Sequence, residues 1–453
     1  MTFWKPRVAA AWLCTLSVTP LGLAQAPAQP VSKGAASTDP AAERRELPLA
    51  TDPFGPEVFR ERRRRLMSQM KNGVALVLSA VRTENHGSLP QDADFLYLSG
   101  LAEESEAAVM LAPQEPHPEV LFLGPLNPER DRWTGYRAVL PNRAVELRTG
   151  FEKVQRSSQL GSVFADVSRR QKEMHFFGPV VGYDAPLPKA LEIYTKTRER
   201  AVGSRIQDAI GMLARMRSVK ESRELEKLAK ASEITVDGHL EAMRKAKPGM
   251  REWDLKQILE DAFRKSGARR LAYDPILGAG PDGCLLHYPG GDRVIQDGEL
   301  VLIDAGAEFD RYASDVTRTF PANGKFTTEQ RKIYEVVLRA HQAALKKVRA
   351  GVTWDELQDT ASKIIADAGY YDYFIHRLGH FVGLEVHDAG VYSEPLRENM
   401  VITLEPGIYI PEKKLGIRIE DVVVVTKDGA RVLSDRLPRD PDAIEKLMQK
   451  PKS

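Results

Sequence analysis

The stretch LVLIDAGAEFDRYASDVTRTF (residues 300–320) decides how the second half of this chain folds, and VITLEPGIYIPEKKLGIRIED (residues 401–421) repeats its pattern. In each stretch, two runs of apolar and β-branched residues flank a polar segment, which predicts an antiparallel hairpin. Each hairpin carries two carboxylates, one on either side of its turn. These carboxylates are Asp304 with Asp315 in the first hairpin, and Glu405 with Glu420 in the second.

The positions of these carboxylates predict how the strands pair. If the members of each pair lie opposite one another, the turns are centred between Phe309 and Asp310 and between Glu412 and Lys413, both within the polar segments. The Cβ atoms of opposite residues are about 4.5–5.5 Å apart, and like charges in such positions are destabilising unless they are neutralised. A cation is the simplest neutralising partner, so four carboxylates on two hairpins indicate a site for two metal ions.

The second half of the chain also contains an internal repeat. A helix, the residues KPGMREWDLKQILEDAFRKSGARR and a histidine-bearing segment precede the first hairpin. A helix, the residues RAGVTWDELQDTASKIIADAGYYDY and another histidine-bearing segment precede the second. His287 follows Gly249 at nearly the distance at which His387 follows Gly351. A helix-helix-hairpin unit used twice predicts pseudo-twofold packing around one shared site.

The residues around the hairpins suggest a hydrolytic chemistry. The carboxylates follow apolar residues, so we expect them to be buried, and buried carboxylates must be paired or bound to metal. HRLGHFVGLEVHD supplies His376, His380 and His387. One imidazole with four carboxylates suits Mn, Co, Fe or Zn and is unlike a copper site or a structural zinc site. Two cations about 3.5–4 Å apart would hold and acidify a bridging water. Glu405 could pass the proton of that water to a leaving amine, and a histidine near the carbonyl would stabilise the oxyanion.

The N-terminus is typical of an exported protein. The basic MTFWKPR precedes the apolar VAAAWLCTLSVTPLGLA, which predicts a secretory signal over residues 1–24, cleaved after Ala24, with an uncleaved anchor as the alternative. Residues 25–52, rich in Ala, Pro and Ser, predict a disordered tether. We therefore expect a periplasmic or secreted protein that has no stable membrane insertion after signal removal. Lys+Arg and Asp+Glu nearly cancel, at 65 against 63, which argues against a nucleic-acid partner.

The remaining sequence predicts two domains. Residues 53–217 form the first, with a helix in PEVFRERRRRLMSQM and strands in VALVLSAV, DFLYLSG, AAVMLAP and PEVLFLGP. The five arginines within residues 60–65 are most simply a solvated helix face. A helix-start signal follows Ser218, so residues 218–445 form the second domain, and residues 446–453 are a C-terminal tail.

These motifs resemble those of one known family. The stretches DFLYLSG, GPDGCLLHY, VLIDAGAEFDRYASDVTRTFP, HRLGHFVGLEVHDAGVY, LEPGIYI and GIRIEDVVVV are similar to those of the pita-bread metallopeptidases, in the aminopeptidase P and prolidase branch. The resemblance covers about residues 54–443. It implies an α/β (α+β) chain in which a mixed-sheet, creatinase-type N-terminal domain precedes a pseudo-twofold pita-bread catalytic domain.

The resemblance also implies roles for individual residues. As metal ligands for two divalent ions, most simply Mn, it gives Asp304, Asp315, His380, Glu405 and Glu420. It places His287 and His387 in substrate binding and transition-state stabilisation. His376 would line the pocket on the proline side, and Arg418 would orient a metal-bound carboxylate. Glu405 would thus be both a ligand and the proton shuttle.

The implied activity is that of an exopeptidase that cleaves the bond between an N-terminal residue and proline, through a water activated by the two metals. Its partners would be peptides with proline in second position, and the resemblance implies a homodimer or homotetramer. A prolidase, which takes dipeptides, is the alternative. A methionine aminopeptidase fits less well because that branch generally lacks the first domain. A non-catalytic peptide- or protein-binding member of the fold fits less well because such members generally lack the full ligand set.

Overall fold

The computed structural model describes residues 54–449, apart from 81–90, 103, 128, 130–131, 134–142 and 179–187. The predicted signal (1–24) and tether (25–52) lie outside the described residues. No helix among the residues described is both long and apolar enough to span a bilayer.

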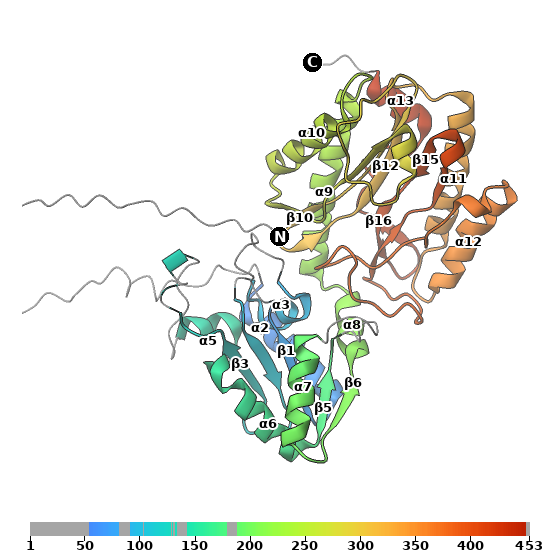
Figure 1. Cartoon of the computed structure of the whole chain (residues 1–453). Coiled ribbons are helices and arrows are strands. Elements are labelled where there is room, and N and C mark those ends of the chain that lie inside the picture. Colours follow the sequence, from blue (N-terminus) through green and yellow to red (C-terminus); the bar gives the residue numbers. More distant parts are fainter. Residues whose placement is uncertain are drawn as a thin grey trace, which may run out of the picture. The chain divides into compact units, whose positions relative to one another are not determined.

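A six-stranded mixed sheet forms the core of the first domain, as predicted (Figure 1). Its strand order is β4-β3-β2-β1-β5-β6. The central strand β1 runs antiparallel to β2 and parallel to β5. The strands are β1 (Val74–Leu78), β2 (Ala108–Leu111), β3 (Glu119–Leu123), β4 (Val154–Arg156), β5 (Glu173–Phe176) and β6 (Arg205–Asp208).

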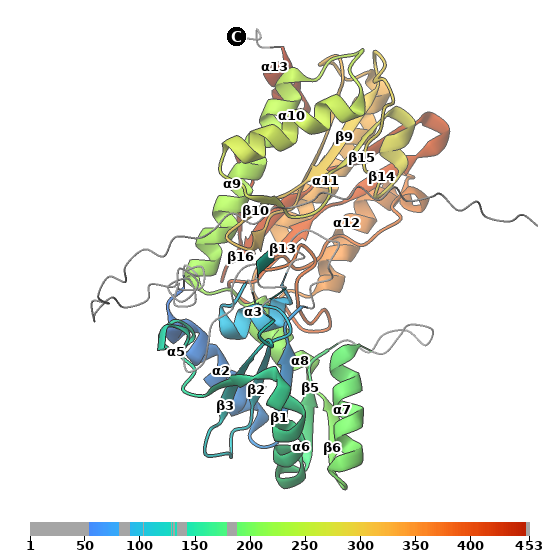
Figure 2. The same ribbon diagram turned by 60° about the vertical axis from the view of Figure 1, so that its left-hand side comes forward.

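Helices cover both faces of this sheet. Alternate apolar side chains of each strand point to opposite faces, and each face forms its own hydrophobic cluster with the helices that cover it. One face packs against α2 (Pro56–Met70), α3 (Ala93–Ser99), α5 (Arg143–Thr149) and α8 (Ile210–Ser218). The other packs against α6 (Leu160–Gln171) and α7 (Lys189–Arg200), which lie beside the strands in Figure 2.

Two sequence-based expectations for this domain are wrong. DFLYLSG lies in helix α3 rather than in a strand. Asp92 caps the start of α3 by accepting from the Phe95 N–H, and Gly100 ends it in the left-handed region. Almost the whole helix is buried, so its apolar residues are continuous and show no helical period.

The arginine-rich face of α2 is not simply solvated. Arg62 and Arg63 are among the most buried side chains of the chain. Arg62 pairs with Glu221 and Glu224, and Arg63 with Glu119. Carboxylates and backbone carbonyls take up most of the donors of these two guanidinium groups, which offsets the cost of burial, and only Arg63 Nη2 of the two groups has no partner among the described residues.

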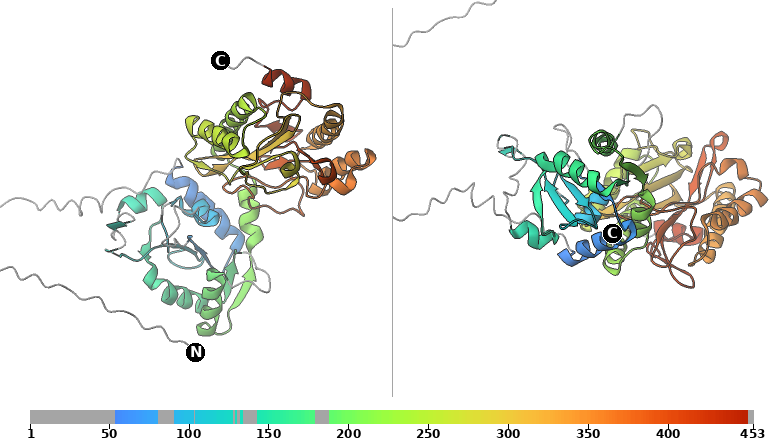
Figure 3. Two further views of the ribbon diagram at one scale, coloured as in Figure 1. Left: turned by 45° about the horizontal axis from the view of Figure 1, so that its top comes forward. Right: turned by 90° about the horizontal axis from the view of Figure 1, so that it is seen from below.

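The predicted repeat is present in the second domain. A helix pair precedes each hairpin, and the second helix of each pair spans 14 residues. Capping boxes fix the starts of α9, α11 and α12. The helices are α9 (Ser222–Lys245) with α10 (Glu252–Lys265), and α11 (Thr328–Lys347) with α12 (Trp354–Asp367). The two pairs lie on opposite flanks of the strands (Figure 3).

Short antiparallel strands fill the space between the helix pairs. Those of the first half are β7 (Arg270–Leu271), β8 (Ile276–Ala279), β9 (Leu300–Ala305), β10 (Ala307–Phe309), β11 (Tyr312–Ala313) and β12 (Val316–Pro321). Those of the second half are β13 (Val401–Leu404), β14 (Gly407–Ile410), β15 (Leu415–Arg418), β16 (Asp421–Val425) and β17 (Ala430–Val432). The last helix, α13 (Pro441–Met448), crosses the boundary predicted at residue 445.

The predicted pairing of the second hairpin is confirmed. Leu404 pairs with Asp421 and Gly407 with Arg418, in one continuous register. That register places Glu405 opposite Glu420, in the gap between the two ladders.

The predicted pairing of the first hairpin is wrong, because the centre of its turn is shifted by one residue. Asp304 pairs with Thr317, so Asp315 is its diagonal neighbour and not its opposite. The turn is centred between Asp310 and Arg311, which adopt φ values of 47° and 74°. A two-residue turn with both residues at positive φ matches the twist of the flanking strands. The centre of this turn therefore lies one residue further along the chain than predicted. Both aspartates still face the same side, because the side-chain period of a strand is two.

Candidate metal centre

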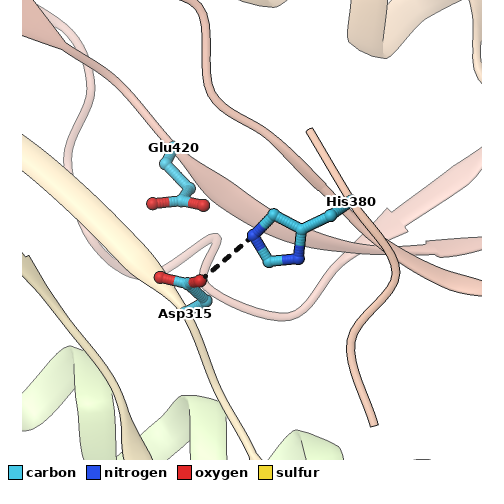
Figure 4. A group of neighbouring side chains, drawn as sticks. All are labelled: Asp315, His380 and Glu420. Atoms are coloured by element: carbon cyan, nitrogen blue, oxygen red, sulfur yellow. Dashed lines mark ion pairs between the residues drawn. The ribbon is translucent and has the colours of Figure 1, made fainter. Parts of the chain in front are cut away.

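Three ligand-type side chains converge between the two hairpins. Asp315, His380 and Glu420 each offer a ligand atom, and these atoms all lie within 4.8 Å of one another. Figure 4 shows the three groups pointing toward one another. Asp315 directly precedes β12 and Glu420 directly precedes β16, so each hairpin contributes a carboxylate. His380 comes from the segment before β13, which Thr403 holds through its N–H and its hydroxyl.

The other two predicted ligands border this group. His380 Nε2 lies 3.4 Å from an Asp315 oxygen and 3.5 Å from a Glu405 oxygen. The Tyr273 hydroxyl contacts both Asp304 and Asp315. A phenol has one proton to donate, so these two carboxylates cannot both be ionised and satisfied by it alone. The structure therefore brings all five predicted ligands to one place.

The carboxylates carry a charge that the protein does not fully balance. Burial raises the pKa of Asp315 and of Glu420 well above the usual range, and the neighbouring carboxylates raise it further. Burial, reinforced by Glu420, raises the pKa of Glu405 to about 8. These raised pKa values show that ionising the neighbouring carboxyl groups together costs free energy. A divalent cation bound between them would remove this cost.

His380 is oriented as a ligand. Its Nδ1 lies 3.0 Å from the Phe381 carbonyl oxygen, so Nδ1 carries the proton and Nε2 presents its lone pair to the carboxylates. The donor set is thus four carboxylates and one neutral imidazole, with no thiolate. This set fits hard or borderline divalent ions.

Arg418 ties the two hairpins together. Its Nη2 donates to Asp304 at 2.5 Å and its Nη1 to the Tyr409 hydroxyl at 2.7 Å. Its Nε donates to the Thr317 hydroxyl at 3.1 Å, and that hydroxyl donates to Glu420 at 2.7 Å. A planar guanidinium can hold three partners in fixed directions, so Arg418 orients carboxylates from both repeats.

Arg318 makes the reciprocal connection from the first hairpin to the second. It is fully buried and donates to Asp421 at 2.8 Å and to the Glu420 carbonyl oxygen at 2.6 Å. Asp421 also contacts His341 and Arg439. Each hairpin therefore supplies an arginine to an acidic residue of the other, and we call Arg418 and Arg318 the crossed arginines.

His376 lies at the end of a directed hydrogen-bond chain. Its Nδ1 donates to the Arg377 carbonyl oxygen at 2.8 Å, and its Nε2 lies 2.8 Å from the Tyr409 hydroxyl. Burial, with Arg418 nearby, lowers the pKa of His376 to about 4. Arg418 donates to Tyr409, and Tyr409 can therefore donate its own proton to the neutral imidazole.

The other two predicted histidines face the same cavity. The rings of His387 and His380 pack edge to face at 4.2 Å between centroids. Burial, with His380 close by, lowers the pKa of His387, which favours a neutral ring. His287 is exposed and also lines this cavity.

A cavity of about 760 Å³ is lined by the five ligand-type residues, by Arg418 and by His287, His376 and His387. Its floor is the ligand set, and apolar side chains line its walls. Among the wall residues are Ile276, Leu286, Pro289, Val386 and Tyr392. The size and the mixed lining suit a short peptide rather than a flat surface contact.

The sequence did not single out Tyr273, Tyr409, Thr317 or Thr403. Thr403 lies two residues before the predicted ligand Glu405, and Tyr409 lies four residues after it. The two-residue period of a strand places both side chains on the same face as Glu405. That period could have identified them. Tyr273 comes from a loop before β8 and carries no periodic signal.

Comparisons with known proteins agree with this geometry. Residues 226–427 match the model of metallopeptidase family M24, and residues 59–176 match the aminopeptidase P N-terminal domain. The chain is 33% identical to a Xaa-Pro aminopeptidase of Haemophilus influenzae over 86% of this chain and 97% of that one. A Xaa-Pro dipeptidase of Pyrococcus furiosus is 42% identical over 48% of this chain and 64% of its own length.

A solved structure has the same fold. A variant of Escherichia coli aminopeptidase P in complex with substrate superposes with a TM-score of 0.77 at 32% identity, over 87% of this chain and 98% of that one. The fold and the site define a metal-dependent peptidase of the pita-bread type. This chain belongs to metallopeptidase family M24, in the group whose members carry the aminopeptidase P N-terminal domain.

Proposed function

We propose that this chain is a Xaa-Pro aminopeptidase, which releases the N-terminal residue from peptides that have proline in second position. The observation that carries the proposal is the convergence of Asp304, Asp315, His380, Glu405 and Glu420 on the floor of one cavity. Full-length relatives named as Xaa-Pro aminopeptidases support the choice of substrate.

The ligand residues would hold two divalent ions, for which we propose Mn. Bound there, the ions would supply Lewis-acid activation of the nucleophilic water. Glu405 lies 3.5 Å from His380 and lines the cavity, so its carboxylate could take the proton of the water and pass it on. Proline leaves as a secondary amine and requires such a proton.

The histidines of the cavity have distinct tasks in this proposal. His387 and His287 lie beside the ligand set and can donate to the oxyanion or bind the peptide. His376 has both ring nitrogens engaged, so it presents its ring face and lines the pocket for the proline ring.

A dipeptidase is the competing function. The Pyrococcus furiosus dipeptidase supports it over 48% of this chain, whereas the Haemophilus influenzae aminopeptidase matches over 86% of this chain. We also propose export, from the N-terminal sequence, and assembly into a homodimer or homotetramer, from the family resemblance. Fractionation of expressing cells with N-terminal sequencing tests the first proposal, and light scattering tests the second.

Substrate length separates the two functions. The purified protein is stripped with a chelator, restored with Mn, and offered Ala-Pro-Ala and Ala-Pro. Release of alanine from the tripeptide establishes the aminopeptidase. Cleavage of the dipeptide alone makes the protein a prolidase, and cleavage of neither with Mn, Co, Zn or Fe overturns the peptidase proposal.

A further inference from the structure

His287 holds its position in the cavity without a ring partner. Among the residues that the structure describes, none forms a hydrogen bond with its imidazole, and its side chain is exposed toward the cavity. The place of this ring therefore depends on the backbone of the segment that carries it, residues 280–291. We call this segment the His287 loop.

One buried carboxylate closes the base of the His287 loop. Glu252, the first residue of α10, has 0% of its surface exposed. Its Oε1 accepts from the Ala279 N–H at 2.8 Å, and its Oε2 accepts from the Gly291 N–H at 3.2 Å. Ala279 precedes the loop and Gly291 ends it, so the two oxygens of one carboxylate hold both ends together.

Further contacts reach the residues next to His287. The Tyr288 hydroxyl is hydrogen-bonded to Glu252, and the Tyr288 carbonyl oxygen accepts from the Leu277 N–H at 3.1 Å. Lys256, one helical turn after Glu252, donates to the Pro289 carbonyl oxygen at 2.9 Å. The two residues that follow His287 are thus both fixed by α10 or by the strand β8 beside it.

We propose that Glu252 is a positioning residue for His287: its carboxylate fixes the loop so that the unsupported imidazole meets the peptide in the cavity. This inference rests on the proposed function, because it assumes that His287 acts on a peptide substrate. Glu252 touches neither the ligand set nor the cavity lining, so its effect on turnover passes through the loop.

The competing view is that Glu252 only stabilises the start of α10. A purely structural residue lowers activity by the same factor whether or not His287 is present. A positioning residue loses its effect when the imidazole that it positions has been removed, because residues that act as one unit are not additive.

A double-mutant cycle with Mn-loaded full-length protein and Ala-Pro-Ala separates these views. Misplacement of a catalytic group by about 1 Å can cost roughly 100-fold in rate, so Glu252→Ala should lower kcat/KM by about 100-fold. In the His287→Ala background the same change should alter kcat/KM by no more than about twofold. Glu252→Gln keeps one acceptor for two N–H donors, so its loss should be intermediate, at about 10-fold.

Glu260→Gln is the matched control. Glu260 lies on the same helix, is also buried, and pairs with Arg264 at 2.9 Å rather than with the loop. Its kcat/KM should stay within about twofold of the unaltered protein. Metal content and melting temperature are measured for every variant, and if Glu252→Ala does not fold, Glu252→Gln carries the cycle.

Equal losses with and without His287 would overturn the inference and leave the proposed function intact. Failure of the unaltered protein to cleave Ala-Pro-Ala would overturn the proposed function, and the inference with it. Loss confined to the His287-containing background supports both.

Discussion

At the scale of single residues, Glu405 has two proposed roles, as a metal ligand and as the group that transfers the proton. Replacing it with Gln removes the carboxylate that contacts His380 and lines the cavity, and keeps the volume of the side chain. We expect kcat to fall by about 10²–10⁴-fold, the range typical of a lost general acid–base. Stopped assays of alanine release from Ala-Pro-Ala, with circular dichroism to verify folding, measure this.

Glu412→Gln is the control for that change. Glu412 lies at the tip of the same hairpin and is exposed. Its activity should equal that of the unaltered protein. A Glu405→Gln protein that retains turnover would exclude Glu405 as the proton shuttle.

The pH dependence of stability also belongs to individual carboxyl groups. In metal-free protein, the pKa of Glu405 in the folded state is about 8, against 4.5 for an ordinary glutamate, and the pKa values of Asp315 and Glu420 are also raised. The folded state therefore binds protons more tightly than the unfolded state. Its stabilisation is fully present below pH about 4.5 and is lost as the pH rises through about 8.

We therefore expect the melting temperature of the chelated protein to fall between pH 6 and pH 8, within a window set by the raised pKa values. Added Mn should remove much of this fall, because the cation replaces the protons. Thermal melts at several pH values, with and without Mn, test this. A chelated protein that becomes more stable toward pH 8 would contradict the assignment of these shifts.

Residue-level prediction was possible where charge patterns were unusual. The four carboxylates could be selected because buried acids in matched positions have few explanations other than metal, and the family resemblance added His380. Tyr273 could not, because its role follows from a loop that comes close to Asp304 and Asp315 only in three dimensions. Arg62 was misjudged because its partners Glu221 and Glu224 lie far along the chain.

At the scale of elements, the crossed arginines connect the hairpins. Arg318 and Asp421 are both fully buried. Removing the guanidinium takes one arginine away from Asp421, which keeps Arg439, and leaves the buried carbonyl oxygens of Glu420 and Leu437 without this donor. We expect Arg318→Met to lower the free energy of unfolding by about 3–5 kcal/mol. Urea denaturation of the chelated protein measures the change.

The exposed pair of Lys363 and Asp367 on α12 provides the comparison. Lys363→Met should cost about 0–1 kcal/mol, because solvent screens a surface ion pair. Equal costs for the two variants would show that the buried pair contributes no more than a surface one.

The hairpins also show what a sequence can predict about register. The second was predicted correctly because its polar tip, around Glu412 and Lys413, places the turn unambiguously. The first was shifted because Asp310 and Arg311 take positive φ, a conformation usually left to Gly or Asn. Helix α3 was missed because a short, wholly buried segment has no amphipathic period.

At the scale of the whole molecule, activity and stability should both depend on the ions. Chelation should abolish cleavage, and restoring Mn at about 100 times its Kd should stabilise the folded state by about 2.7 kcal/mol for each ion bound. Titration with Mn, followed by elemental analysis, should find two ions per chain at full activity. Full activity with one ion per chain would exclude the dinuclear mechanism.

Domain organisation was predictable at this scale because composition, the repeat and the break near Ser218 are properties of long stretches. The closing helix α13 was partly assigned to a tail because its amphipathic pattern extends over only eight residues at the end of the domain.

The crossed arginines have a consequence for the history of the two repeats. A duplicated unit is ordinarily free to lose residues once its copy supplies the function. Here, however, Arg318 of the first repeat pairs with Asp421 of the second, and Arg418 of the second pairs with Asp304 of the first. A substitution at one of these positions in either repeat therefore removes an ion pair from its partner in the other repeat, so the two repeats have to change together. Two polypeptides divided between the repeats should be inactive apart and regain activity only when they are produced in the same cell.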